Sequence, residues 1–399
     1  MPSRVSTLST LNSSVNLLQR LQAEIDLTGR QIASGRRILT PADDPISSAR
    51  SIELREALSR TQQFDRNAAI VVGRLQQEES ALSLAGDVLQ RVRELSVQAS
   101  NATQGNESRR LIAVEIRSQL QQLVKIANQR DGNGSYMFSG TRDDVQPVSQ
   151  AGSVFTYNGD DGQRQIQVGE GRTVPDGDAG SDVFFRVRRG NGDFQALAAA
   201  GNTGLGIVGN GSLTDPTLYD RDTYTVTFTA ANAYEVRDSS AALVSSGAFE
   251  PGDTIAFRGI EFAIDGQPDA GDAFVASPSE FQDMFSMISD LATAIETETR
   301  DDLSRVQMSN GINRGLENLD QALGVLLSVR TDAGSRLAVV ESQQNANSAN
   351  AITFQETLAK IEDLDYAEAL SRLSAQTGIL EAAQRSFVRV QGLSLFNFL

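Results

Sequence analysis

The Asp-Asp pairs at residues 43–44, 160–161 and 301–302 come nearest to catalytic chemistry in this chain. Two neighbouring carboxyl groups can share a proton and act as general acid and base. The first and third pairs, however, stand where helices are expected to begin, and the second lies in a predicted turn. Helix starts for the first and third pairs, and a turn for the second, are therefore the better interpretations.

Two glycine-containing segments resemble ligand-binding loops. Residues 176–182 (DGDAGSD) space their oxygen ligands somewhat like a calcium loop, but the glycine is misplaced and no bidentate Glu follows at the required offset. Residues 204–209 (GLGIVG) satisfy a dinucleotide fingerprint, yet no predicted strand precedes them and no helix follows. We interpret the first as a solvated turn and the second as a loop.

The composition excludes most catalytic classes. The chain has no His and no Cys, which removes the usual general base, the commonest metal ligands and every Ser-His or Cys-His pair. We predict no catalytic residue, no metal site, no cofactor and no enzymatic activity. With 51 acidic and 35 basic residues, the net charge of −16 disfavours nucleic acid and anionic membranes as partners.

Membrane and secretion signals are also absent from the sequence pattern. No run of about 18 apolar residues predicts a transmembrane helix. In the first 30 residues or so, apolar side chains alternate with Ser, Thr, Asn and Gln, so no cleavable signal peptide is predicted.

The elements that would position any site divide the chain into helical ends and a β-prone middle. Residues 3–130 and 279–394 are apolar-periodic with almost no proline, whereas 146–278 are short β-prone runs between Gly, Pro and Asp. We predict an α+β multidomain protein, in which both terminal segments build a long antiparallel helical rod that carries an inserted small antiparallel β domain. The expected domains are a terminal coiled-coil layer (1–42 with 364–399), a helical rod domain (43–145 with 279–363) and a β-rich outer domain (146–278).

The first and last helices carry matching apolar stripes interrupted by polar or small residues. Gly35 closes the first helix, and the stripe changes phase after Asp363. Isolated helices of this kind are marginal in water, so we expect them to pair with each other or with neighbouring subunits. The predicted packing residues are Leu8, Leu11, Val15, Leu18, Ile25, Ile32, Tyr366, Leu370, Leu373, Leu380, Phe387, Val390, Leu393 and Phe396.

Further helices are expected over 43–100, 106–130, 279–299 and 301–361. The apolar stripe of the helix over 301–361 spans about seven heptads, from Ile312 to Ile361. The stripe of the helix over 43–100 includes Glu78 among its apolar residues. In the middle, residues 154–157, 158–162 and 165–168 are predicted to form a strand, a turn and a strand. Other strands are expected at 183–187, 224–228, 256–264 with a break at Gly259, and 273–276.

Several motifs together resemble the flagellin superfamily, in the variant of its hook-filament junction proteins. The segments are 33–45 (ASGRRILTPADDP), 135–142 (SYMFSGTR) followed by Gln146-Pro147, 363–369 (DLDYAEA) and 391–396 (QGLSLF). Their order along the chain is the expected one. The residues that carry the resemblance include Gly35, Pro41, Asp43, Asp44, Pro45, Tyr136, Phe138, Gly140, Asp365 and Tyr366.

This resemblance implies a structural protein that is exported unfolded by the flagellar type III apparatus and acts outside the cell. It implies a ring of identical subunits between the first hook-filament junction protein and the flagellin filament. It also implies an export chaperone that holds the C-terminal helix, with no nucleic acid and no membrane insertion.

Three alternatives stay open. Within the superfamily the chain could be a flagellin filament subunit, although Pro41, Pro45, the 136–140 motif and the C-terminus are closer to the junction protein. A protein of another class, an extracellular binding module, would use residues 146–278 as its ligand domain. An enzyme is the weakest alternative, because no convergent polar cluster is visible.

Overall fold

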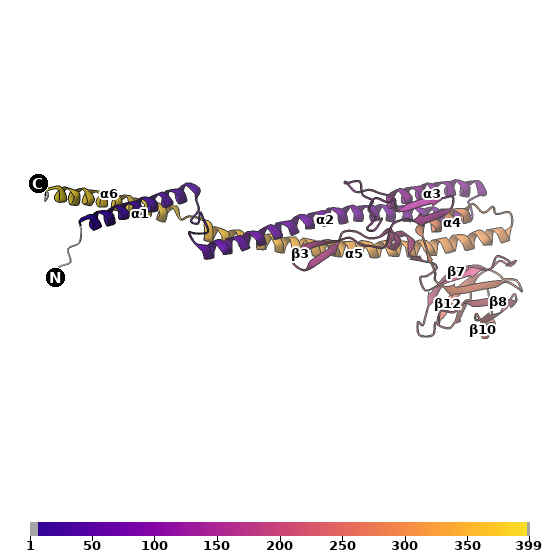
Figure 1. The fold of residues 1–399 in the computed structure, drawn as a ribbon. Coiled ribbons are helices and arrows are strands. Elements are labelled where there is room, and N and C mark those ends of the chain that lie inside the picture. Colours follow the sequence, from indigo (N-terminus) through magenta and orange to yellow (C-terminus); the bar gives the residue numbers. More distant parts are fainter. Residues whose placement is uncertain (1–6, 397–399) are drawn as a thin grey trace. The chain divides into compact units, whose positions relative to one another are not determined.

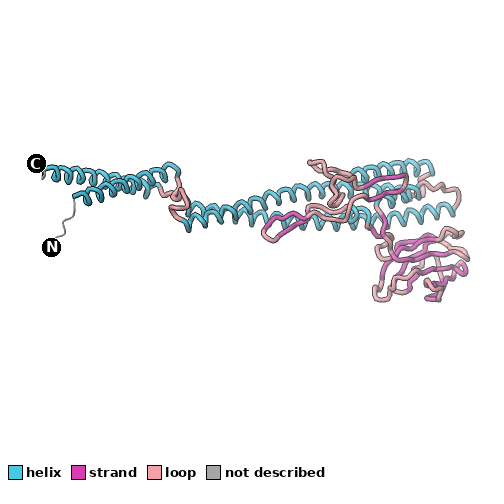
Figure 2. The backbone as a smooth tube through the Cα atoms, viewed as in Figure 1, coloured by secondary structure: helices cyan, strands magenta, loops and turns pink. Residues whose placement is uncertain are grey.

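Long helices from both ends of the chain and an antiparallel β region make up the fold, which confirms the predicted fold class (Figures 1 and 2). The computed structural model describes residues 7–396. Its helices are α1 (Thr7–Ser34), α2 (Pro45–Ser100), α3 (Asn106–Ala127), α4 (Met284–Ile295), α5 (Asp302–Glu362) and α6 (Tyr366–Phe396).

The chain divides into two compact units. One consists of Met1–Arg66 with Gln344–Leu399, and the other of Asn67–Gln343. Both divisions fall inside the helices α2 and α5, which are continuous, whereas the sequence places its boundaries at helix ends. None of the described helices combines the length and apolar composition that crossing a bilayer requires.

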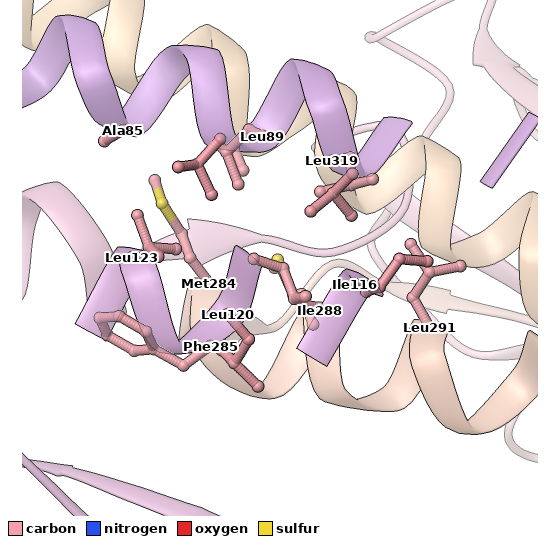
Figure 3. Close-up of a cluster of buried hydrophobic side chains, with 14 of the residues drawn as sticks. Ala85, Leu89, Ile116, Leu120, Leu123, Met284, Phe285, Ile288, Leu291 and Leu319 are labelled. Atoms are coloured by element: carbon pink, nitrogen blue, oxygen red, sulfur yellow. The ribbon is translucent and has the colours of Figure 1, made fainter. Parts of the chain in front are cut away.

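The larger unit has a helical core built by α2, α3, α4 and α5 (Figure 3). Leu89 of α2, Leu120 of α3, Ile288 of α4 and Leu319 of α5 all contribute buried side chains to it. Gly315 lets α4 approach α5 closely, because a Cβ there would lie 2.5 Å from Leu291 Cδ1. The predicted α2 stripe from Val71 to Val92 is fully buried, as expected from its spacing.

The first part of the β region packs on the helices. Strands β1 (Val148–Ala151) and β2 (Val154–Tyr157) form one hairpin, and β3 (Gln165–Gly169) and β4 (Arg172–Pro175) form another. The predicted hairpin between 154–157 and 165–168 is therefore wrong, although both strands exist. Each of these two strands pairs with a segment nearer in the sequence, β1 or β4, that was not predicted to be a strand. Phe155 and Val168 are buried against helical residues.

A one-turn π-helix follows at Ser181–Phe185, where the sequence predicted a strand over 183–187. Its residues Val183 and Phe184 enter the helical core, so packing against α4 overrides the β propensity of the run. Only the short strand β5 (Val187–Arg188) pairs there, with β14 (Phe281–Gln282).

The second part of the β region forms two antiparallel sheets around a separate aromatic core. One sheet has the strand order β10-β9-β8-β13-β6 and the other β11-β12-β7. The core contains Phe228, packed edge-on against Phe249 at a ring-centroid distance of 5.0 Å. The strands are β6 (Phe194–Ala198), β7 (Ile207–Leu213), β8 (Tyr224–Ala230), β9 (Ala233–Arg237), β10 (Leu243–Ala248), β11 (Thr254–Phe257), β12 (Ile260–Asp265) and β13 (Ala273–Pro278).

The predicted strands at 224–228, 256–264 and 273–276 are confirmed, and Gly259 with φ of +74° provides the expected break. The interpretation of 204–209 as a loop is wrong in its second half. Ile207, Val208 and Gly209 belong to β7, which is stabilised by pairing with β12. Local propensity does not reveal such a pairing.

Candidate assembly interface

The paired terminal helices are the first component of the candidate site, and both belong to the smaller unit. Helix α1 packs along α6 (Figure 1). Leu21, Thr28 and Gln31 of α1 and Ala369 of α6 are the most buried. Inside this seam Thr28 Oγ1 donates a hydrogen bond to Gln376 Oε1 at 3.0 Å.

The predicted packing residues are only partly in this seam. Leu18, Ile25, Ile32, Leu373, Leu380 and Phe387 are half-buried, whereas Val15, Tyr366 and Leu370 are exposed. The side chains of Leu8, Leu11, Val390, Leu393 and Phe396 lie outside the described ones. The apolar stripe of the first helix, continued from the sequence, passes through Gln22 and Gly29, but the buried residues are their neighbours Leu21 and Thr28.

A segment that we call the joint links this helix pair to α2 and α5. It consists of two chain segments, residues 35–44 and 361–366, and both segments belong to the smaller unit. Leu364 N donates to Gly35 O at 3.0 Å, and Arg37 N donates to Glu362 O at 2.7 Å. The two chain segments are thus tied by their backbones in the short stretch where no helix runs.

Gly35 ends α1 in the left-handed region, with φ of +68°, as the sequence predicted. A Cβ at this position would lie 2.9 Å from the Tyr366 hydroxyl, the first residue of α6. Glycine is required twice here, by the backbone conformation and by the close approach of the tyrosine.

Side chains brace the joint further. The Arg37 guanidinium donates to Ile361 O at 2.9 Å, and Gln31 Nε2 donates to Arg37 O at 2.6 Å. Arg55 of α2 forms an ion pair with Glu362 at 2.6 Å. Since Arg55 and Arg37 are exposed, we ascribe to these bonds a role in geometry more than in stability.

The Pro-Ala-Asp-Asp-Pro motif turns the chain into α2. Asp43 Oδ2 accepts from Leu39 N at 3.0 Å and Thr40 N at 2.7 Å, and hydrogen bonding from Thr40 lowers the pKa of this carboxyl. Asp44 Oδ1 accepts from Ser47 N at 3.1 Å, so Asp44 caps α2 and Pro45 occupies the first helical position. Hydrogen bonding from the side chain and then the backbone of Ser47 lowers the pKa of Asp44.

The carboxylates at 160–161 and 301–302 also accept hydrogen bonds from nearby backbone N–H groups. Asp301 Oδ1 accepts from Ser304 N at 2.8 Å at the start of α5, and Asp160 Oδ1 accepts from Thr141 N at 2.8 Å in a turn. At the start of α6, Asp365 Oδ1 accepts from Ala367 N at 2.9 Å. The interpretation of these pairs as two helix starts and a turn is confirmed.

The 136–140 motif lies in the larger unit, where it follows α3 in the chain and packs against the π-helix. Phe138 is fully buried and packs edge-on against Phe184 at 5.2 Å. Gly140 has φ of +71°, and a Cβ there would lie 2.2 Å from Asp160 O. The Arg130 guanidinium lies over the Tyr136 ring, 4.3 Å from its centroid.

A buried ion-pair network is the main feature that sequence reasoning missed. Asp176 and Asp178 are 3% and 7% exposed, so the interpretation of residues 176–182 as a solvated turn is wrong. Asp176 binds Arg74 at 3.0 Å and Arg164 at 2.5 Å, while Asp178 binds Arg336 at 2.7 Å. The arginines come from α2, β3's flank and α5, and only the fold brings them together.

Glu78 of α2 completes this network. Its Oε1 accepts from Asp178 N at 2.8 Å, whereas its Oε2 is buried without a hydrogen bond. Burial, and then the charge of Asp178, raise the pKa of Glu78 to about 8. A Glu in the apolar stripe was the available sequence signal, because a charge at a core position requires buried partners.

Among residues 7–396, no three acidic side chains are placed so that they could hold a metal ion. The arrangement of the candidate interface provides packed apolar seams, caps and backbone ties.

Comparison with known proteins agrees with this arrangement. The family model described as the bacterial flagellin N-terminal helical region matches residues 5–143. Flagellar hook-associated protein 3 of Escherichia coli (strain K12) is 24% identical over 99% of both chains.

Two solved structures are more similar in sequence. FlgL of Xanthomonas campestris is 36% identical, with 76% of this chain and 99% of that chain covered and a TM-score of 0.69. Flagellar hook associated protein-3 of Legionella pneumophila is 32% identical, with 77% and 98% covered and a TM-score of 0.74. The chain therefore belongs to the family of flagellar hook-associated protein 3, also called FlgL.

Proposed function

We propose that this chain is a structural subunit of the bacterial flagellum that forms the junction between hook and filament. Its family membership supports the flagellar role, because the relatives are hook-associated and junction proteins. In this role the subunits form an adaptor ring on which flagellin polymerises. The ring contacts the first hook-filament junction protein on one side and flagellin on the other.

The observation that carries this proposal is the incomplete burial of the terminal helix pair. Leu17 of α1 is 52% exposed, and Leu370, Ile379 and Val388 of α6 are 52%, 54% and 65% exposed. Two helices cannot cover apolar residues that point away from their shared seam. Neighbouring subunits in a ring would cover them, so assembly would convert a marginal helix pair into a buried one.

The domain layout follows from this role. Residues 1–42 and 364–399 would form the inner coiled-coil layer, residues 43–145 and 279–363 the helical domain around it, and 146–278 the outer region. Marginal terminal helices suit export in an unfolded state through the flagellar type III apparatus. An export chaperone would hold the C-terminal helix before secretion, when its apolar side chains lack their assembled partners. We infer a mechanical role without enzymatic activity.

Deletion of the encoding gene tests the junction role. We expect intact hooks, no filaments and flagellin released as monomer into the culture supernatant, because the filament would lack its adaptor. Electron microscopy of hooks and immunoblotting of the supernatant measure both outcomes, with the reintroduced wild-type gene as control. Normal filaments on the deletion strain would contradict the proposal.

The same experiment separates the alternatives. If the chain were a flagellin filament subunit, its loss would remove the filament material itself and no flagellin would accumulate outside the cell. If it were an extracellular binding module, flagellar structure would be unchanged.

A further inference from the structure

Strand β6 is an open edge of the five-stranded sheet. Among the described strands it is hydrogen-bonded to β13 alone. An edge strand presents unpaired N–H and C=O groups that can pair with another extended chain. The strand has the sequence Phe-Gln-Ala-Leu-Ala and contains no proline or charged residue that would block such pairing.

The phase of the β6–β13 ladder identifies the open groups. Ala199 N donates to Ala273 O at 3.0 Å, so residues of odd number in β6 direct their backbone groups at β13. Those of even number direct them outward. The outward groups of Phe194 are bonded to Asn191, since Phe194 N donates to Asn191 Oδ1 at 2.9 Å and Asn191 N donates to Phe194 O at 3.1 Å.

Ala196 and Ala198 are the remaining outward-facing residues of β6. In the described part of the chain, no residue bonds to their outward N–H and C=O groups. Their short side chains leave the backbone accessible, and both residues are only half-buried.

The neighbouring edge strand shows the opposite treatment. Strand β7 is the edge of the three-stranded sheet, and amide side chains of α5 cover its backbone. Val208 N donates to Asn310 Oδ1 at 2.8 Å, and Asn313 Nδ2 donates to Val208 O at 3.1 Å. Strand β7 lies beside β6, and Asn191 Nδ2 donates to Gly211 O of β7 at 3.1 Å. Helix α5 closes the edge of β7, whereas the outward backbone groups of Ala196 and Ala198 bond to no described residue.

Two cavities border the open edge. The first has a volume of about 360 Å³ and lies between Ala196 and Ala198 of β6, Val208 of β7, and Asn310 and Glu317 of α5. The second has about 440 Å³ and is lined by Gln195 and residues of α4 and α5. Leu197 and Gln307 line both, and each volume falls in the range of known ligand pockets.

The second cavity has an excess of positive charge. Arg189 and Arg314 line it, and neither forms an ion pair with any residue of the described chain. Arg189 Nε is buried without a hydrogen bond. Its one acidic neighbour in the lining, Asp290, accepts a hydrogen bond from Gln282 Nε2 at 3.0 Å. In a chain of net charge −16, two unpaired arginines beside an open strand favour a carboxylate-bearing ligand.

We propose that the β6 edge is a docking site for an extended acidic peptide segment of a partner polypeptide. The segment would add a strand beside β6 by pairing with the outward groups of Ala196 and Ala198. Its carboxylate would bind Arg314 and Arg189 in the second cavity. The inference is independent of the junction role, because it uses no residue of α1, α6 or the joint.

Selection from a displayed library of random eight-residue peptides on the intact chain tests the proposal. We expect enrichment of acidic peptides without central proline. Synthetic copies of the enriched peptides should bind Ala198→Pro at least about fivefold more weakly, since proline removes one outward N–H donor. Arg314→Ala should weaken binding about tenfold. Isothermal titration measures both, and amide exchange should slow at Ala196 and Ala198 when peptide is bound.

Matched variants control for misfolding and for unspecific charge effects. Ala248→Pro places proline at an outward position of β10, the opposite edge of the same sheet, because the next residue, Phe249, donates its N–H inward to Asn232 O. Arg60→Ala removes an exposed arginine of α2. Both should bind the peptides as the wild type does.

Enrichment that fails to exceed the level on Ala198→Pro would overturn the proposal, as would equal binding by Ala198→Pro and Ala248→Pro. Self-association of the intact chain that Ala198→Pro abolishes, without peptide enrichment, would assign the edge to a second copy and also overturn it.

Discussion

At the scale of single residues, buried charge is the feature with the clearest consequences. Three arginines, at positions 74, 164 and 336, surround the buried carboxyls of Asp176 and Asp178. Glu78 adds a third carboxyl, and Asp131, bonded to Arg74 at 2.7 Å, a fourth. Burial, and then the charge of Asp178, raise the pKa of Glu78, and a neutral Glu78 leaves three carboxylates opposite three arginines.

We predict that Glu78→Gln stabilises the chain at alkaline pH. The pKa of Glu78 is about 8 in the folded chain against an ordinary value of 4.5. The folded state thus retains a proton that the unfolded chain releases, so this stabilisation is complete below about pH 4.5 and is lost as pH rises through 8. Gln keeps the neutral form at every pH.

Free energies of unfolding at pH 6 and pH 9 measure this effect. The wild type should lose on the order of a few kcal/mol more than Glu78→Gln between the two values. Glu53→Gln, an exposed residue of the same helix, serves as control and should follow the wild type. The raised pKa of Glu317, about 7, acts equally in all three chains. Parallel pH dependence of wild type and Glu78→Gln would contradict the prediction.

Gly35 provides a second prediction at this scale. Gly35→Ala should destabilise the joint by about 1–2 kcal/mol, because alanine is strained at positive φ and its Cβ would meet the Tyr366 hydroxyl. In the double variant with Tyr366→Ala, the destabilisation caused by the steric contact should disappear, whereas the destabilisation caused by the positive φ should remain. Thermal melting of the helical circular dichroism signal measures the four chains of this cycle. Full additivity of the two substitutions would show that the contact is unimportant.

At the scale of elements, the residues buried between α1 and α6 show which of two neighbouring faces of α1 lies in the seam. The sequence stripe passes through Val15, Gln22 and Gly29, whereas the observed seam contains Leu21 and Thr28. Adjacent residues on a helix are only about 100° apart, so an interrupted stripe permits either face to be buried. The hydrogen bond from Thr28 to Gln376 forms on the observed face of α1, the face that contains Leu21.

Truncation of seam residues tests this register. We expect Leu21→Ala to lower the melting temperature of the terminal helices more than Val15→Ala, because Leu21 is 9% exposed and Val15 is 40% exposed. Hydrogen-exchange mass spectrometry of α1 peptides measures the local effect. A larger effect of Val15→Ala would place the other face of α1 in the seam.

At the scale of the whole molecule, the two units differ in the size of their cores. The larger unit has three clusters of buried apolar side chains, whereas the described part of the smaller unit buries few large ones, such as Leu21. Local opening free energies follow burial, ranging from about 0 at fraying ends to the global value in a core.

We therefore predict that amides of α1 and α6 exchange far faster than those around Leu89 and Leu319 in the dilute full-length chain. Limited proteolysis should remove about 40 residues from each end first. Hydrogen-exchange mass spectrometry of the monomer and of the assembled flagellar junction measures the difference, and protection of both ends should rise on assembly. Equal protection of ends and core in the dilute monomer would contradict assembly-coupled ordering.

Local patterns alone determined much of this protein. The spacing of apolar residues predicted α2 and α5 to within a few residues, since both helices are long and strongly periodic. Gly35, Asp44 and Pro45 marked the helix ends, because capping depends on neighbouring residues. The motifs around 33–45 and 136–140 pointed to the family, because each motif is a short run of consecutive residues that can be read without the fold.

Tertiary structure alone decided what depends on residues distant in sequence. The runs 154–157 and 165–168 are strands, but their partners are β1 and β4, and strand pairing is not written in either run. The acidic loop at 176–178 is buried because Arg74 and Arg336 reach it from two helices. The open edge of β6 likewise exists only because of the sheet order. Chain periodicity fixes local conformation, whereas pairing, burial and charge balance arise only when separate elements meet in space.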